Sequence, residues 1–269
     1  MNFVPEPFAT VYVTLVGLIV GSFLNVCIHR LPLGLSVVHP RSRCPGCGKG
    51  IRWYQNVPLV SWILLRGRCA ACRQRISVRY PAVEALAGLL VLGAWRLYGP
   101  TLAFPIVAGF ALAMLVLFFT DYDHQLLPDA ITLTGTIVGL ALAWFNPFLY
   151  GEGWRAVWSA LAGAGVGSGL LWGFGAVYRK VRGVDAMGLG DVKMMAMVGA
   201  FTGPAGVLLT IFGGSLVGAL VGLAMVPLKG RSLQDTLPFG CFLAPAALFA
   251  LVYGRRVAEF YLGIVIPTP

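Results

Sequence analysis

Apolar stretches recur along the whole chain and are separated by short polar segments. Most stretches hold roughly 18 to 22 residues, about the length of a helix that crosses a bilayer. The pattern predicts an all-α polytopic membrane protein with about eight transmembrane helices. The expected spans are 9–27, 81–98, 102–120, 130–147, 156–178, 192–203, 206–227 and 239–254, of which the sixth is the shortest.

Composition agrees with this pattern. The chain is 58% hydrophobic and only 11% charged, which excludes an ordinary soluble domain. Its 35 glycines fall largely inside the expected spans, where small residues let membrane helices pack closely. The first apolar stretch is expected to be a retained anchor and not a secretory signal, because the arginines follow it and no basic region precedes it.

The distribution of charge predicts the orientation in the membrane. Ten of the 20 Lys and Arg residues lie between Arg30 and Arg79, a segment without Asp or Glu. The positive-inside rule makes this segment cytoplasmic and the amino terminus external. Eight crossings then place Asp121, 179–191 and 229–231 on the cytoplasmic side. Topology and contact with anionic membrane lipids account for the net charge of +10, so no nucleic-acid partner is expected.

Two Cys-x-x-Cys pairs lie in this basic segment, and their members are Cys44, Cys47, Cys69 and Cys72. Two such pairs can supply four thiolates in tetrahedral geometry to one zinc ion. Disulfides are the structural alternative, but they rarely persist in the reducing cytosol. Redox catalysis would not need two matched pairs. We therefore expect a closed, structural zinc site that stabilises a small zinc-ribbon-like loop domain.

These features predict three regions. Residues 1–28 form the first transmembrane helix, and residues 29–80 form the cytoplasmic zinc-binding loop domain. Residues 81–269 form a transmembrane core of about seven helices.

Four carboxylates stand near the ends of expected spans on the cytoplasmic side. Asp129 and Asp191 can cap the helices that follow them, and Asp123 fits a solvated loop residue. A cap does not explain Asp121, because a negative charge at the carboxyl end of a helix opposes the helix dipole. Two carboxylates that share a site can hydrolyse a peptide, since one ionises and activates water while the other stays protonated and donates to the carbonyl.

Two other classes of protein remain open at this point. An ion- or proton-coupled transporter with a zinc-stabilised loop would also carry intramembrane acids, although such acids usually lie near the midplane and not at one face. A zinc-ribbon membrane adaptor without catalysis would leave Asp121 unexplained.

Motifs along nearly the full length resemble the type IV prepilin peptidases, also called leader peptidase and N-methyltransferase. The matching segments are GSFLNVCIHRLP at 21–32, CPGC and CAAC in the basic loop, NVPLVSW at 56–62, RYPAVE at 79–84, TDYDHQLLPD at 120–129 and MGLGDVK at 187–193. Their order and spacing make the resemblance specific.

The resemblance implies an intramembrane aspartic peptidase of the Gly-x-Gly-Asp type, with Asp121 and Asp191 as catalytic residues. It assigns supporting positions to Asp123, Asp129 and Lys193, and to the motif glycines Gly188 and Gly190. These glycines would let an extended substrate backbone approach Asp191. Lys193 would tune the surroundings of Asp191 or contact phospholipid.

The resemblance also implies a location and substrates. The enzyme would lie in the bacterial inner membrane and cleave the leader of type IV prepilins and type II secretion pseudopilins after a glycine at the cytoplasmic edge. It would then methylate the new amino terminus with S-adenosylmethionine, an activity usually associated with the cytoplasmic loop. Glu84, the only acid near that loop, is the candidate for contact with the new amine.

Overall fold

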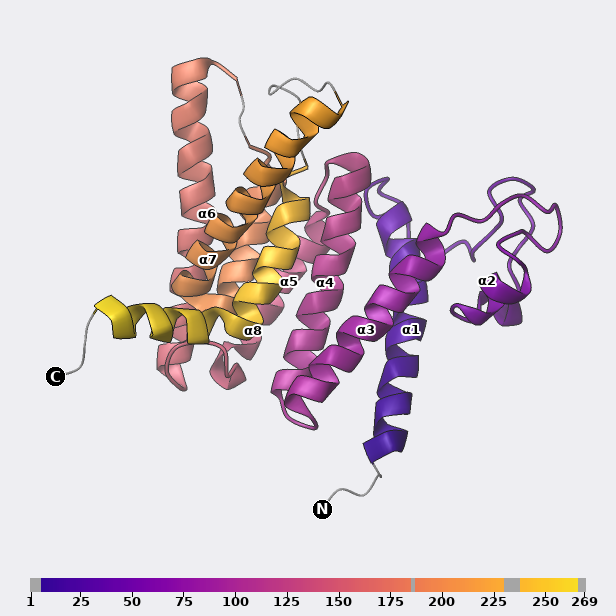
Figure 1. The fold of residues 1–269 in the computed structure, drawn as a ribbon, viewed down its shortest axis with the longest axis horizontal. Coiled ribbons are helices and arrows are strands. Elements are labelled where there is room, and N and C mark those ends of the chain that lie inside the picture. The colour runs from indigo at the N-terminus through magenta and orange to yellow at the C-terminus, as the bar shows by residue number, and fades with distance from the viewer. Residues whose placement is uncertain (1–5, 185–186, 230–237, 266–269) are drawn as a thin grey trace. The chain divides into compact units, whose positions relative to one another are not determined.

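The computed structural model describes residues 6–184, 187–229 and 238–265. In these ranges the chain is helical, apart from its loops and two isolated β-bridges, which confirms the all-α class. Within these described ranges, six helices are long and apolar enough to cross a membrane. They are α1 (Glu6–Arg30), α3 (Arg79–Tyr98), α4 (Ala103–His124), α6 (Trp154–Arg182), α7 (Leu189–Lys229) and α8 (Gly240–Val265) (Figure 1).

The difference between six long helices and the eight expected spans has two sources. The expected span 130–147 is α5 (Asp129–Leu142), continued by the short 3₁₀ helix η2 (Ala143–Phe145), and this apolar segment is shorter than the six. The expected sixth and seventh spans both lie in α7, where the backbone of Gly203 leaves helical geometry with φ 70° and ψ −177°. Glycine adopts this positive φ without the steric cost that a side chain would add.

The chain reverses direction at Gly203. A methyl group on Gly167 of α6 would lie 2.3 Å from the carbonyl oxygen of Met195 and 3.3 Å from a methyl of Val207. In a continuous helix those two α7 residues would be about 18 Å apart, since each residue adds about 1.5 Å. The two halves of α7 therefore lie side by side as a helical hairpin, and the predicted boundary between spans 192–203 and 206–227 falls at its turn.

The chain divides into two compact units, residues 1–116 and 117–269. In the first unit, α1 packs against α3. Gly17 of α1 faces Val91 and Gly88 of α3, and nearer the loop the side-chain amide of Asn25 donates to the carbonyl of Tyr80 at 3.1 Å. Residue numbers increase along α1 while those of the contacted α3 residues decrease, so the two helices are antiparallel. The loop that joins them therefore leaves and returns at one end of the pair.

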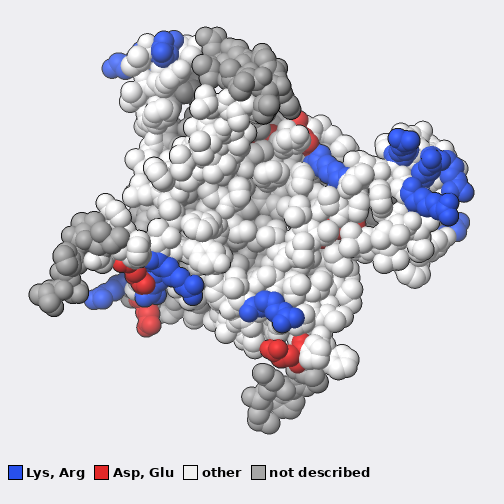
Figure 2. Space-filling model, viewed as in Figure 1, with Lys and Arg blue, Asp and Glu red and all other residues white. Residues whose placement is uncertain are grey.

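This loop contains the 3₁₀ helix η1 (Trp53–Asn56) and the short helix α2 (Val60–Leu64). Exposed basic side chains cover the loop, which has no acidic residue between Arg30 and Arg79. Figure 2 shows their concentration over the segment that carries α2 in Figure 1. The exposed ones are Arg41, Arg43, Lys49, Arg52, Arg66, Arg68, Arg73 and Arg75.

In the second unit, α7 packs against α5, α6 and α8. Gly135 of α5 faces Met197 of α7, and Gly139 faces Phe201. Residue numbers increase in the same direction along both helices, so α5 and the first half of α7 run parallel. Their amino termini therefore lie at the same end of the unit, which determines where the acidic residues meet.

Candidate functional site

Four helix ends meet at one end of the second unit. They are the carboxyl end of α4 and the amino ends of α5, α7 and α8. Leu127, in the short connection from α4 to α5, lies between two of them: a methyl group on Gly190 would lie 3.1 Å from the Leu127 Cβ, and one on Gly240 would lie 3.2 Å from a Leu127 methyl. Three amino ends bring the positive poles of three helix dipoles to this place, where negative side chains are favoured.

Asp121 is buried at this junction, with 5% of its surface exposed. Its Oδ2 atom accepts a hydrogen bond from the backbone N–H of Cys241 at 3.0 Å. The Cys241 thiol in turn donates to the carbonyl of Phe118 in α4 at 3.3 Å. Cys241 is the second residue of α8, so Asp121 occupies the amino end of that helix. The positive pole of α8 therefore offsets the unfavourable interaction of the Asp121 carboxylate with the dipole of α4.

Asp191 lies in the first turn of α7 and is half-buried. Its neighbour Gly190 contacts Leu127, which also contacts Gly240 beside Asp121. The shared contact with Leu127 places Asp121 and Asp191 at the same cluster of helix ends. Residues 70 positions apart are thus brought to one site, as paired-carboxylate chemistry requires.

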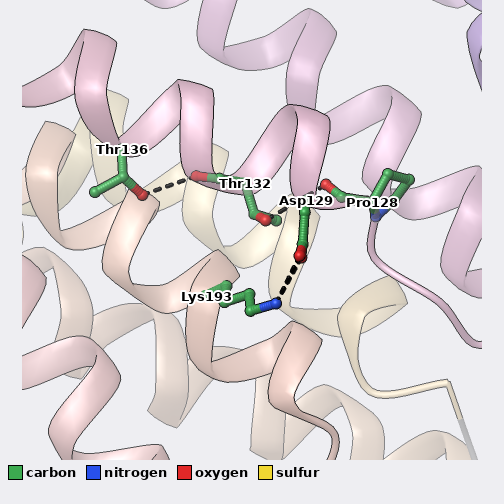
Figure 3. A network of polar contacts seen from close by, with 5 residues as sticks. All are labelled: Pro128, Asp129, Thr132, Thr136 and Lys193. Atoms are coloured by element: carbon green, nitrogen blue, oxygen red, sulfur yellow. Dashed lines mark hydrogen bonds and ion pairs between the residues drawn. The ribbon is translucent and has the colours of Figure 1, made fainter. Parts of the chain in front are cut away.

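Lys193 pairs with Asp129. Its Nζ atom donates to both carboxylate oxygens of Asp129, at 2.7 and 2.8 Å (Figure 3). The pair joins the first residue of α5 to the fifth residue of α7, and it is partly exposed, at 35% for Lys193 and 57% for Asp129. Lys193 therefore neutralises the neighbouring acid and contributes to the alignment of the two helix starts.

The predicted helix caps need correction. Pro128, not Asp129, is the N-cap of α5, and Asp129 is the first helical residue. Asp191 is the third residue of α7, and its backbone N–H donates to the carbonyl of Gly188 at 3.2 Å. Both acids still favour their helices, because a negative charge in the first turn complements the dipole. Asp123 is exposed in the last turn of α4, which continues to His124.

The two motif glycines differ. A side chain at Gly190 would press on Leu127, so this glycine permits close packing. A methyl group on the exposed Gly188 would lie 3.6 Å from an Asp191 oxygen, an ordinary contact distance. Gly188 therefore leaves more room beside Asp191 than Gly190 does.

The four cysteines of the first unit form one cluster. Their sulfur atoms all lie within 4.8 Å of one another, and those of Cys44 and Cys72 are 3.7 Å apart. Zinc with four sulfur ligands at about 2.3 Å requires sulfurs about 3.8 Å apart. The donor set and its spacing therefore fit zinc.

Each Cys-x-x-Cys pair forms a turn that we call a knuckle, and the two knuckles share the same backbone hydrogen bond. Gly48 N–H donates to Cys44 O at 2.9 Å, and Arg73 N–H donates to Cys69 O at 3.0 Å. These two donors have positive φ, 68° and 61°. In the second knuckle the backbone N–H groups of Cys72 and Ala71 lower the pKa of the Cys69 thiol to about 6. This cysteine therefore favours the thiolate form that binds metal.

Glu84 is buried in α3 near the loop, with 8% of its surface exposed. Its Oε2 atom accepts a hydrogen bond from the backbone N–H of Leu59 at 2.9 Å. The contact ties the start of α2 to α3 and places the carboxylate beside the loop, as the sequence predicted.

Comparisons with known proteins identify the family. Residues 15–98 match the bacterial peptidase A24 N-terminal domain, and residues 108–223 match the type IV leader peptidase family. A prepilin leader peptidase/N-methyltransferase from Pseudomonas putida is 38% identical over 94% of this chain and 93% of its own length. The chain belongs to the type IV leader peptidase family. Proteins with the same description from Stutzerimonas stutzeri and Pseudomonas aeruginosa are each 38% identical, over 96% of this chain and 95% of their own. No solved structure matches the chain.

Membership in the type IV leader peptidase family confirms the resemblance drawn from the motifs. The protein is a multi-pass membrane enzyme with peptidase and N-methyltransferase activities. No finding favours the alternative of an ion- or proton-coupled transporter.

For this leader peptidase, the sequence prediction missed the contribution of α8. Gly240 and Cys241 contact Asp121 directly, and a methyl group on Gly240 would lie 2.9 Å from its Oδ2 atom. The sequence does mark this helix start, because Pro238 and Gly240 come just before the last apolar run. Gly240 has no side chain there, so the backbone of the helix start is open to a neighbouring group. The motifs do not show which carboxylate would contact the amino end of this helix.

Proposed function

We propose that this protein cleaves the leader of type IV prepilins and type II secretion pseudopilins after a glycine, and then methylates the new amino terminus. Asp121 and Asp191 are the catalytic pair. The observation that carries this assignment is the position of these two residues, from α4 and α7, at one cluster of helix ends, where Leu127 contacts the glycines beside both.

The surroundings of each aspartate suggest its role. Asp121 Oδ2 already accepts the Cys241 N–H, so this carboxylate is held as an acceptor and suits the base that takes a proton from the attacking water. Repulsion between the two carboxylates favours one shared proton. Asp191 would hold that proton and donate a hydrogen bond to the carbonyl of the scissile peptide, beside the open position at Gly188.

The charge pattern supports a bacterial inner-membrane location with the aspartates and the basic loop on the cytoplasmic side. A prepilin offers a short basic leader, a glycine and then a hydrophobic helix, so its cleavage point lies at that membrane edge. The basic side chains of the enzyme would also contact anionic membrane lipids.

Two further groups belong to the proposal. Cys44, Cys47, Cys69 and Cys72 would hold zinc, which stabilises a loop too small for a large apolar core and leaves no open position for catalysis. S-adenosylmethionine would supply the methyl group.

The test uses detergent-purified protein and a prepilin peptide, with loss of the leader followed by mass spectrometry. Asp121→Asn and Asp191→Asn should each lower the cleavage rate at least about 10²-fold, the scale of general acid and base catalysis. Glu152→Gln, an acid-to-amide change at an exposed loop position, is the matched control and should cleave normally. Cleavage at the wild-type rate by either aspartate variant would refute the catalytic pair.

A further inference from the structure

A groove of about 970 Å³ lies in the first unit, between the membrane helix α1 and the loop. One wall is a face of α1 that runs from Leu15 to Arg30, and loop residues from 37–42 and 51–60 form the other wall. None of the four cysteines and none of the carboxylates near the helix ends lines this groove. Neither of the two sites described above therefore accounts for it.

The α1 wall is the side of that helix that is turned away from α3. Gly17 and Gly21 face α3. Leu15 and Ile19 each precede one of these glycines by two positions, and two positions in a helix of 3.6 residues per turn point to nearly opposite sides. Both side chains line the groove and are more than half exposed within the protein, at 52% and 62%. The groove is therefore accessible to lipid along a membrane-spanning helix.

The largely apolar part of the groove is as deep as one membrane leaflet. Leu15 and Val26 both line it, and the 11 residues from one to the other add about 16 Å at about 1.5 Å per residue. The hydrocarbon core of a bilayer is about 30 Å thick, so one leaflet accounts for about 15 Å. An acyl chain that starts at the loop end would therefore extend along the whole of this wall.

The loop end of the groove is cationic. Arg30 and Arg41 are the charged residues that line it, without an acidic residue. The Arg30 guanidinium donates to the carbonyls of Ser36 and Pro40, each at 2.8 Å, and so holds the backbone next to Arg41. Trp53 also lines the groove and is 83% exposed, and tryptophan is enriched at the depth of lipid headgroups. This end therefore suits an anionic phosphate, which guanidinium groups bind through paired N–H donors.

Charge distinguishes between two occupants of such a groove. The hydrophobic helix of a prepilin would also fit an apolar wall, but a basic leader precedes that helix. Two arginines without an acidic neighbour among the lining residues would repel this leader, since like charges placed together oppose binding. An anionic lipid has the opposite charge at the same place and an apolar chain where the wall is apolar.

We infer that this groove binds an anionic phospholipid of the cytoplasmic leaflet, with an acyl chain along α1 and its phosphate at Arg30 and Arg41. The inference rests on the cytoplasmic orientation given in the proposed function, and it does not depend on either enzymatic activity. The bound lipid fills the space between α1 and the loop and attaches the loop to the membrane surface.

The first test titrates delipidated wild-type protein in detergent with phosphatidylglycerol, phosphatidylcholine or glycerol phosphate, and native mass spectrometry measures the bound fraction. Phosphatidylglycerol should bind at least about fivefold more tightly than phosphatidylcholine, because only the former has a net negative charge. Glycerol phosphate has the phosphate but no acyl chain, so it should bind at least about tenfold more weakly than phosphatidylglycerol. Equal binding of the two lipids, or the absence of a saturable phosphatidylglycerol site, would overturn the inference.

A second test changes the cationic end. Arg41→Gln removes an exposed charge from the groove and leaves the hydrogen bonds of Arg30 in place. It should weaken phosphatidylglycerol binding at least about tenfold, as for a lost hydrogen bond to a charged group. Arg68→Gln, at an exposed arginine of the same loop that does not line the groove, is the matched control and should bind as wild type does. Equal losses in the two variants would show general attraction to the loop and would overturn the inference.

A third test blocks the apolar wall. Ile19→Trp places a larger side chain in the groove and should also weaken phosphatidylglycerol binding at least about tenfold. Val16→Trp, at a nearby exposed position of α1 that does not line the groove, should bind as wild type does. Zinc content and thermal unfolding show that the variants are folded.

Two outcomes of this third test would overturn the inference. One is unchanged phosphatidylglycerol binding by folded Ile19→Trp. The other is a prepilin helix peptide that displaces phosphatidylglycerol from wild type and fails to bind Ile19→Trp, which would assign the groove to the substrate. Absence of leader cleavage by wild type that still binds the lipid would instead refute the proposed function alone.

Discussion

The cysteine cluster and the aspartate pair are assembled in different ways. Each cysteine knuckle closes on itself, because its backbone hydrogen bonds join residues at most nine positions apart, as from Ile51 N–H to the Ser42 carbonyl. The aspartate site has no such local closure. Asp121 is held by Cys241, 120 positions away, and Asp191 reaches the same cluster of helix ends from another helix. A metal site can therefore be predicted from short spacing, whereas the aspartate site depends on how whole helices pack.

This difference predicts different vulnerabilities. The loop depends on its ligands, since a domain of this size has little apolar core without metal. The aspartate pair depends on the backbone of a neighbouring helix, so a change that leaves every carboxylate in place can still disable it.

The largest expected effect is loss of the metal site. Cys44→Ser removes one of four thiolates and should release zinc and unfold the loop, because zinc binding contributes about 10–16 kcal/mol in small zinc domains. Metal analysis and limited proteolysis of the loop measure both effects, while leader cleavage should persist. Cys27→Ser, at a buried thiol outside the cluster, should retain zinc. Purified wild type without zinc would contradict the assignment.

The next effect is on Asp121 through its neighbour. Gly240→Ala places a methyl group 2.9 Å from Asp121 Oδ2 and 3.0 Å from its Cγ, so the carboxylate must move from the Cys241 N–H. We expect cleavage to fall about 10²-fold, as for a displacement of about 1 Å in an active site. Gly263→Ala, in the same helix but facing open space, is the control. Equal cleavage by both variants would argue against the role of α8.

A smaller effect distinguishes the two knuckles. Arg73 occupies the position that Gly48 occupies in the first knuckle, with a positive φ that is costly for a residue with a side chain. Arg73→Gly should stabilise the loop by up to about 1 kcal/mol, measured by its thermal unfolding. Arg75→Gly, at a β-bridge without positive φ, should not stabilise it.

The smallest effect concerns the ion pair beside the aspartates. Asp129→Asn removes a partly exposed pair, and such pairs contribute about 0.2–1 kcal/mol. Cleavage should therefore fall no more than about fivefold, and Asp129→Asn with Lys193→Met should be no slower than either change alone. A fall of more than about 10²-fold would place Asp129 in the chemistry itself.

Much of the fold could be predicted from the pattern of apolar residues. The expected boundary near 203–206 coincides with the hairpin at Gly203, because Gly203-Pro204 interrupts an otherwise apolar run. The cysteine cluster followed from spacing alone. The length of α5 and η2 was less predictable, since apolar residues continue to Phe148 after the helix has ended.

The surroundings of the aspartates could not be predicted in the same way. The pattern gave no reason to place Cys241 beside Asp121, because that contact depends on the packing of α8. Lys193 was expected to tune the surroundings of Asp191 or to contact phospholipid, and the pattern did not indicate its ion pair with Asp129, which depends on the parallel packing of α5 and α7. Side-chain partners between helices depend on register, which one sequence does not specify.

The most direct test of the account is whether its two activities separate. Asp191→Asn should leave a full prepilin uncleaved, yet with S-adenosylmethionine it should add one methyl group to a peptide that already lacks its leader, as measured by mass spectrometry. Glu84→Gln, which changes the acid expected to contact the new amine, should show the reverse, and a mixture of the two variants should convert full prepilin to the methylated product. Loss of methylation of the leaderless peptide by folded Asp191→Asn would contradict two separate sites.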